Sequence, residues 1–437
     1  MPEYKGMKYL RNKLAMKEPR VSTRYRYYEM KDRAIDRGIT IPANLRRQYM
    51  ATLGWCSKAV DSIADRLTFR EFAEDNFNIN EIYRMNNPDV LFDSAILSAV
   101  ISSCSFIYIS PDEDGFPRLQ VIDGGNATGI IDPITGLLQE GYAVLKRDDR
   151  GLPKLEAYFT AEYTQYHQKG VGVTRADANP APYPLLVPII YRPDARRPFG
   201  HARISRTCMY VQKFAKRTLE RSDVAAEFYS IPQRYILGLS QEAERMEKWQ
   251  ATVSSMLQFD KDEDGDHPVA GQFQQMTMAP LSEQLRMAAS IFAGETGLTT
   301  DDLGFITDNP SSAEAIKASH ETLRLTAKKA QKTFGTGFLN AGYLAACVRD
   351  EYAYQRRQMY LTTPKWEPIF DPDASALTVI GDGAAKLNAA VPGYFGADNL
   401  QDITGIKPSE DINNAGYSTP AAGGSNAGLP EESGQEQ

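Results

Sequence analysis

APLSEQLRMAASIFAGETG, residues 279–297, has the apolar spacing of a single helix, and LTTDDLGFITDNPSS, residues 298–312, has the composition of a loop. A very long helix is predicted after this loop, from residue 313 to about residue 354. Asn309 and Pro310, followed by two serines, are typical of the start of such a helix. Because helices hold both of its ends, we expect the loop to take a defined position rather than to act as a linker.

Upstream of this unit the sequence predicts another long helix and a small insertion of mixed structure. Residues 204–230 have a helical pattern without a wide apolar stripe, and at ~1.5 Å per residue this helix spans about 40 Å. Ile231 and Pro232 end it. The insertion is expected to begin and end with extended segments that flank a helix at 241–259.

Nearer the N-terminus, predicted helices give way to a predicted antiparallel sheet. One amphipathic helix is expected to begin at Pro42 and to run to Leu67, and a second to occupy 88–105. Residues 106–166 alternate between apolar and polar positions in short runs separated by turn residues, which is typical of antiparallel strands. Residues 182–198 are proline-rich and extended.

The C-terminal part continues the mixed pattern. Gly335 and Gly337 are expected to kink the long helix, and a strand is expected at 366–370. Two further helices are predicted between residues 374 and 403, whereas residues 418–437 lack aromatic side chains and are expected to be disordered. These patterns together predict an α+β fold that is mainly helical.

Composition indicates a globular protein of two or three compact units. The chain has 437 residues, of which 42% are hydrophobic and 24% are charged. No apolar run approaches the ~20 residues that a membrane span needs, and the charged N-terminal stretch has no apolar signal-peptide core. The four cysteines lie far apart without a CxxC pair, which predicts free thiols formed in a reducing cytoplasm.

Charge is unevenly distributed along the chain. The net charge of −7 argues against a DNA-binding protein of the usual basic type. Residues 5–37 nevertheless hold eleven basic side chains, against five acidic ones between residues 3 and 36. This stretch is interpreted either as a solvated helix face or as an arm that contacts a neighbouring subunit or nucleic acid.

The sequence contains no convincing catalytic motif. The nearest approach to a phosphate-binding loop is GDGAAK at 381–386, but the residue after the lysine is Leu387 rather than serine or threonine. The four histidines form neither an HExxH motif nor a Cys/His cluster. We therefore expect no cofactor and no catalytic residues.

Two acidic stretches raise the question of a metal site. DKDEDG at 260–265 matches the first half of a calcium-binding loop, but the twelfth position is Gly271 instead of glutamate, which favours an acidic loop tip. Asp301 and Asp302 are adjacent carboxylates that a metal-dependent nuclease would use. Without further ligands in the pattern, we expect no metal.

Six stretches, taken in order, carry a resemblance to a known family. They are YYE (27–29), NLRRQY (44–49), VDSIADRL (60–67), FGHARI (199–204), AAEFYSIPQRY (225–235) and NPSSAEAIKA (309–318). In this order they resemble the portal proteins of tailed bacteriophages of the siphovirus type. Met30 stands where the family often has glycine, and Ala202 stands where serine is usual. The resemblance covers about residues 25–412 and is strongest in the last stretch.

The resemblance implies a portal fold that assembles as a ring, with twelve subunits. The implied parts are a basic arm (1–41), a wing of helices and antiparallel sheet (42–203), a stem helix (204–230), a clip (231–278), a second stem helix (279–297), a tunnel loop (298–312), a long wing helix with a return strand (313–372), a crown (373–417) and a disordered tail (418–437).

The resemblance also implies the function. The ring would sit at one capsid vertex of the virion, after assembly in the host cytoplasm, and would conduct double-stranded DNA during packaging and ejection. Its partners would be further copies of itself, terminase, the major capsid protein and scaffold, and the head–tail adaptor, with no membrane. No enzymatic activity is implied. The loop carries acidic side chains without lysine or arginine, which suits sliding contact with DNA because each neutralised phosphate adds affinity.

The resemblance assigns three sets of site residues. The tunnel loop would face DNA through Asp301, Asp302, Phe305, Thr307 and Asn309. The stem would face the channel through Arg286. The clip would bind partners through Arg234, Tyr235, Trp249, Asp260 and Asp262. Two alternatives remain at this point, which are a metal-dependent nuclease using the two adjacent aspartates and an adaptor or minor capsid protein of different stoichiometry.

Overall fold

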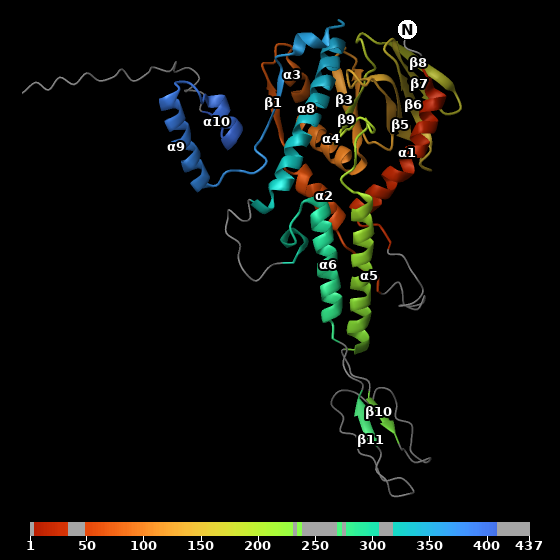
Figure 1. The fold of residues 1–437 in the computed structure, drawn as a ribbon. Helices are drawn as coiled ribbons and strands as arrows, with labels where there is room; N and C mark the ends of the chain where they lie inside the picture. The colour runs from red at the N-terminus through yellow and green to blue at the C-terminus, as the bar shows by residue number, and fades with distance from the viewer. Residues whose placement is uncertain are drawn as a thin grey trace, which may run out of the picture. The chain divides into compact units, whose positions relative to one another are not determined.

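The computed structural model describes residues 4–33, 49–229, 234–237, 269–272, 277–305 and 318–408. The chain divides into two compact units, residues 1–369 and residues 370–437 (Figure 1). Within the described segments, no helix has both the length and the apolar character needed to cross a bilayer.

A five-stranded antiparallel sheet forms one part of the first unit. Its strand order is β4-β5-β6-β7-β8, so each strand pairs with its neighbours in sequence. The strands are β4 (Ala127–Ile131), β5 (Leu138–Arg147), β6 (Pro153–Phe159), β7 (Tyr163–Gln168) and β8 (Gly172–Ala178). The alternating pattern expected over 106–166 is therefore confirmed as antiparallel strands, and the sheet extends further along the chain to β8.

The basic N-terminal stretch is a helix that packs against this sheet. α1 (Met7–Tyr28) buries Leu10 and Leu14 against Tyr142 and Tyr158. Lys8, Arg11, Arg20 and Arg26 are exposed, so the interpretation of this stretch as a solvated helix face agrees with the described part, whereas contact with a neighbouring subunit or nucleic acid stays a prediction. Four buried side chains among many charged ones leave too weak a periodic signal to mark the extent of the helix in sequence.

A second antiparallel sheet has the order β3-β2-β9 and contacts two helices. Its strands are β2 (Cys104–Pro111), β3 (Pro117–Ile122) and β9 (Leu186–Ile190), and its helices are α4 (Pro88–Ser102) and α8 (Glu321–Arg349). The glycines of α8 allow a close approach instead of a kink. A Cβ at Gly337 would lie 2.8 Å from Ile189 of β9, and one at Gly335 would lie 2.6 Å from Pro364. The helix continues through both positions.

A two-stranded pairing joins distant parts of the first unit. β1 (Phe69–Ala73) pairs antiparallel with β12 (Thr363–Trp366). The ring of Phe92 packs between Phe69 and Phe338, at centroid distances of 4.3 Å and 4.7 Å. This aromatic cluster brings β1, α4 and α8 into one core.

The remaining helices around this core are short. They are α2 (Trp55–Ala64), α3 (Ile79–Arg84), η2 (Asp301–Leu303) and η3 (Arg356–Met359). The helix expected from Pro42 to Leu67 is shorter than predicted, because residues 49–54 are not helical and α2 begins at Trp55. Residues 34–48 lie outside the described part of the chain.

Two long helices run side by side below the body of the first unit in the view of Figure 1. They are α5 (Arg206–Tyr229) and α6 (Ala279–Thr296), and both match the helices expected from the sequence. Between them in sequence, β10 (Arg234–Leu237) pairs antiparallel with β11 (Val269–Gln272). The helix expected at 241–259 lies outside the described residues.

The second unit contains two helices in its described part. α9 (Ala374–Ala390) and α10 (Ala397–Thr404) confirm the two helices expected there. The side chain of Asn388 bonds both the N–H and the carbonyl of Phe395, at 2.7 Å and 3.0 Å, and so fixes the turn between the helices. The tail expected to be disordered lies outside the described residues.

A buried carboxylate holds the start of α1 on the five-stranded sheet. Glu140 of β5 is only 1% exposed. It accepts hydrogen bonds from the backbone N–H groups of Lys5 and Gly6, both at 3.0 Å, and from the Tyr158 hydroxyl at 2.9 Å. These three donors satisfy a charge that would otherwise be costly to bury.

Glu140→Ala is expected to lower the free energy of unfolding by about 2–4 kcal/mol, because it leaves one buried and two partly buried donors without their acceptor. Urea unfolding followed by circular dichroism measures the change. Glu113→Ala, in the exposed β2–β3 turn, is the matched control. An equal effect of the two substitutions would contradict this role of Glu140.

Candidate functional site

A buried arginine joins the body of the first unit to the two long helices. Arg203 is 8% exposed and lies three residues before the first residue of α5. Its Nε donates to the carbonyl of Ala59 in α2 at 3.2 Å, and its Nη2 donates to the carbonyl of Thr296 at the end of α6. Its backbone N–H donates to Val100 of α4 at 2.9 Å. One residue thus connects α2, α4 and α6 at the point where α5 begins.

The chain enters this junction through a turn that requires glycine. Gly200 has a φ of 73°, and a Cβ there would lie 2.1 Å from the carbonyl oxygen of Tyr191. The next N–H, of His201, donates to that same oxygen at 3.0 Å. The Ser205 hydroxyl then accepts the N–H of Cys208 at 3.2 Å, as a helix N-cap does, and donates to Glu295 of α6 at 2.7 Å.

Buried polar side chains hold α5 against the body. Gln212 accepts the N–H of Cys56 at 2.8 Å and donates to Asp32 at 3.1 Å. Lys216, one turn further along, lies 3.3 Å from the Asp32 carboxylate and donates to its backbone carbonyl at 2.6 Å. Thr218 donates to Gln284 of α6 at 3.0 Å. These bonds explain why the sequence of α5 lacks a wide apolar stripe, since polar residues occupy its packed face.

The outer face of α6 is exposed in this single chain. Met287 is 52% exposed and Ile291, one turn later, is 48% exposed. Arg286, which was expected to face a channel, is exposed on the same helix. Its orientation toward a channel stays a prediction.

The beginning of the loop after α6 packs against the body. Leu298 and Leu303 are buried, and Phe305 contacts the main core. Asp302 accepts the N–H and the hydroxyl of Thr299, both at 2.9 Å.

His320, which directly precedes α8, lies with its Nε2 3.3 Å from the Asp302 carboxylate. Burial opposes ionisation of Asp302, but the bonds from Thr299 and the nearby His320 outweigh it and lower the pKa of this carboxyl. The start of the loop is therefore in contact with the residue that precedes α8.

The structure separates the predicted site residues into three groups. Asp301 is exposed, whereas Asp302 and Phe305 make the contacts given above. Arg234 and Tyr235 lie on β10, opposite Gln272 and Gly271 of β11. The others lie outside the described residues, and these are Thr307, Asn309, Trp249, Asp260 and Asp262. The DNA-facing and partner-binding roles of all these residues stay predictions.

The described residues offer no ready metal centre. No group of three or more histidine, cysteine, aspartate or glutamate side chains converges anywhere in the ranges that the structure describes. Among the described residues, Asp301 and Asp302 therefore have no third side chain with which to hold a metal ion. The carboxylate of Asp302 is already in contact with His320.

Sequence patterns do not single out Arg203 or the polar contacts of α5. A signal for the latter exists, because Gln212 and Lys216 fall on the same helix face as Cys208, Val211 and Ala215. Polar side chains at such positions indicate buried partners elsewhere in the chain. For Arg203, the only signal in the local sequence is its position between a glycine turn and the start of a helix.

The chain belongs to the family described as "Phage portal protein, SPP1 Gp6-like", whose model matches residues 7–368. It is 25% identical over 389 residues to the portal protein of Mycobacterium phage L5, which covers 83% of this chain and 77% of the relative. The portal protein of Mycobacterium phage D29 is 25% identical over 347 residues, covering 73% of this chain and 69% of the relative.

Solved structures of gene transfer agent particles are more distantly similar. A chain of the virion of the native particle is 15% identical, with a TM-score of 0.44 over 84% of this chain and 93% of that one. A chain of the native neck, computed with C12 symmetry, is 16% identical with a TM-score of 0.45 over 84% and 94%.

Arg203→Met is expected to loosen the junction. It removes two donors from the buried carbonyls of Ala59 and Thr296, so the free energy of opening the last turn of α6 should fall by about 2–3 kcal/mol. Hydrogen–deuterium exchange of α5 and α6 measures this change. Arg206→Met, at the exposed start of α5, is the control, and equal exchange in the two variants would contradict the role of Arg203.

Asp302→Asn is expected to destabilise the loop base in a pH-dependent manner. Because the folded pKa of Asp302 is lowered, its charge stabilises the fold above the unfolded carboxyl pKa of about 3.9 and loses this effect as pH falls through the folded value. The substitution should cost about 1 kcal/mol at pH 6 and less near pH 2. Thermal unfolding at both pH values measures the difference, and a constant difference would refute the assignment.

Proposed function

We propose that this chain assembles into a closed ring, with twelve subunits, at one vertex of a phage capsid. The ring conducts double-stranded DNA into the head during packaging and out of it during ejection. The family match over residues 7–368 is the observation that carries this proposal. In this role the protein acts as a structural conduit of the virion and performs no catalysis.

The parts of the chain take distinct roles in this proposal. The sheets and the helices around them, within 42–203 and 313–372, form the wing, and α1 in the N-terminal arm packs on it. The pair α5 and α6 forms the stem, the segment at 231–278 forms the clip, residues 298–312 form the tunnel loop, and residues 373–417 form the crown. The exposed apolar residues of α6 support the stem assignment, because a neighbouring subunit would cover them in a ring.

The electrostatics of the loop fit a channel that does not hold DNA tightly. Residues 298–312 carry three aspartates and no lysine or arginine. Since each phosphate neutralised by a basic side chain adds affinity, an acidic loop favours transient contact. The link between Asp302 and His320 would hold the two ends of this loop while DNA moves past it.

The expected partners follow from the same role. The clip would dock terminase during packaging and the head–tail adaptor afterwards, through Arg234, Tyr235, Trp249, Asp260 and Asp262. The wing would contact the major capsid protein and scaffold. Assembly in the host cytoplasm would precede incorporation into the virion.

Ring formation tests the proposal directly. Negative-stain electron microscopy of the purified protein should show annular particles with an open centre, and light scattering should give a mass near twelve times 48.7 kDa. Monomers or dimers at every concentration would contradict a self-assembling ring. Divalent-metal-dependent cleavage of DNA that Asp301→Ala abolishes would favour a nuclease instead.

A further inference from the structure

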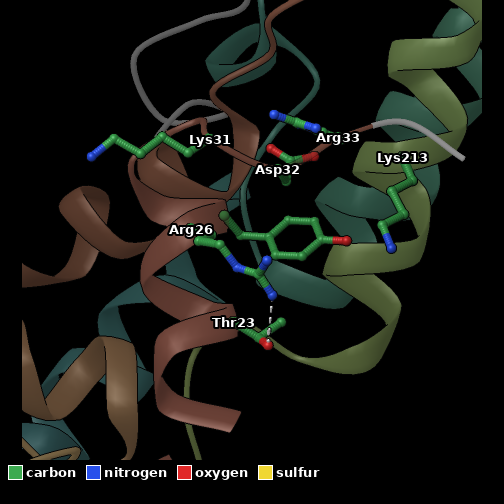
Figure 2. A pocket seen from close by; sticks show the side chains of 7 residues that line it. Thr23, Arg26, Lys31, Asp32, Arg33 and Lys213 are labelled. Carbon is green, nitrogen blue, oxygen red and sulfur yellow. Dashed lines mark hydrogen bonds between the residues drawn. The ribbon is translucent and has the colours of Figure 1, made fainter. Parts of the chain in front are cut away.

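A basic cavity opens where α1 ends and α5 passes beside it (Figure 2). It encloses about 420 Å³. Its lining residues are Thr23, Arg26, Tyr27, Lys31, Asp32, Arg33 and Lys213. We call this cavity the basic pocket. Four of the seven side chains are cationic and one is anionic, so its charge is strongly positive.

The single carboxylate that lines the basic pocket, that of Asp32, is neutralised by a lysine of α5. Asp32 is buried and lies 3.3 Å from Lys216 of α5, while Gln212 donates to it at 3.1 Å. Asp32 therefore does little to neutralise the cations that line the pocket. The charge that these cations carry is not balanced by the wall of the pocket itself.

The cations of the basic pocket have few acidic partners of their own. Lys31 pairs with the exposed Glu29 at 2.6 Å. Arg26 donates to the hydroxyl of Thr23 at 3.2 Å, and Lys213 lies 5.6 Å above the ring of Tyr27. Within the described residues, no ion pair joins Arg26, Arg33 or Lys213 to a carboxylate. Three positive charges are thus available to an anionic partner.

An acidic surface lies on two other helices of the same unit. It consists of Asp61 in α2, Asp65 directly after α2, and Asp89 and Asp93 in the first half of α4. The last three are exposed. We call these four residues the acidic surface.

The four carboxylates of the acidic surface repel one another. Partial burial, and then repulsion from Asp89 and Asp65, raises the pKa of Asp93. Partial burial also raises the pKa of Asp61, and repulsion from Asp65 adds to the shift, while the hydrogen bond from the Tyr28 hydroxyl and the charge of Lys58 oppose it. In the part of the chain that the structure describes, no ion pair joins a carboxylate of the acidic surface to a cation of the basic pocket.

Helix dipoles account for only part of this arrangement. Asp89 in the first turn of α4 and Arg26 in the last turn of α1 are both favourable at those ends. Asp65 lies at the C-terminal end of α2, where a negative charge is unfavourable, and Asp61 is four residues before it. Asp93 likewise follows Asp89 by four residues. The isolated subunit gains nothing from these repulsive pairs.

We propose that the basic pocket of one copy receives the acidic surface of the next copy in the ring. This inference rests on the proposed function. A closed ring is built from heterologous contacts, so each copy must present two different and complementary surfaces. Opposite charge on the two surfaces favours the correct orientation and penalises contact between like surfaces. Arg217, one turn beyond the pocket on α5, adds a buried Nε that finds no acceptor among the described residues.

A second copy fits the observations better than DNA does. Phosphate groups would neutralise the basic pocket but would leave the acidic surface uncompensated, and that surface would repel the duplex. Contact between copies neutralises both regions at once. A role of the basic pocket in binding DNA is therefore kept as an outcome of the test.

Two charge-reversal variants test the contact in the full-length chain. The pocket variant carries Arg33→Glu and Lys213→Glu, and the surface variant carries Asp65→Lys and Asp93→Lys. Asp89 and Arg26 are left unchanged because helix dipoles favour them. Each variant should raise the protein concentration for half-maximal ring formation by about tenfold or more, because like charges then face each other across the contact.

An experiment with a mixture of the two variants is decisive. In an alternating ring, every contact between the pocket variant and the surface variant pairs opposite charges, either native or exchanged. Equal amounts of the two separately purified proteins should therefore recover rings at the wild-type concentration. Arg150→Glu, in the exposed β5–β6 turn, is the control and should assemble normally.

Folding and DNA binding are followed in parallel. The surface variant relieves repulsion, so its thermal midpoint should equal or exceed that of the wild type, and loss of its rings cannot be attributed to unfolding. Filter binding of a short DNA duplex at low salt measures any phosphate contact. A pocket variant that forms normal rings but binds the duplex less tightly would overturn the proposal in favour of a phosphate site.

The remaining outcomes also decide the question. Normal assembly of either variant, or failure of the mixture to recover assembly, overturns the contact while leaving the ring intact. If the wild type forms open oligomers rather than rings, the proposed ring is refuted. Loss of those oligomers in each variant and their recovery in the mixture would still support the contact.

Discussion

The guanidinium of Arg203 is the contact on which the arrangement of the first unit depends. It donates to a carbonyl in the middle of α2 and to the last carbonyl of α6, and its backbone N–H binds α4 shortly before α5 begins. The carbonyl at the end of α6 has no partner within its own helix, and one side chain joins it to an element that is far away in sequence. The turn at Gly200 positions Arg203 for these contacts. The long helix pair thereby takes a fixed direction from the body.

Local patterns allowed much of this fold to be predicted from sequence. α6 and α9 have regular apolar spacing and clear ends, and the strands from β2 to β6 alternate between turn residues. α1 was missed because its few buried side chains lie among many cations. The pairing of β1 with β12 and the contact between Asp302 and His320 were missed for another reason. Both join segments whose sequences carry no information about each other.

Charge segregation reconciles an acidic protein with a role around DNA. The net charge of −7 does not describe any one surface, because the basic pocket and the acidic surface lie on different helices. In a ring these regions would neutralise each other between copies, and the loop facing the channel would remain acidic. The assembly would then be stabilised by charge without holding the DNA that passes through it.

Photo-crosslinking in DNA-filled heads tests the central claim most directly. A photoreactive residue is placed at position 286 on α6, at position 301 in the loop, or at position 150 in the exposed β5–β6 turn. The account predicts crosslinks to DNA from positions 286 and 301 and none from position 150. Crosslinks from position 150 alone, or from none of the three in filled heads, would contradict passage of DNA along α6 and the loop.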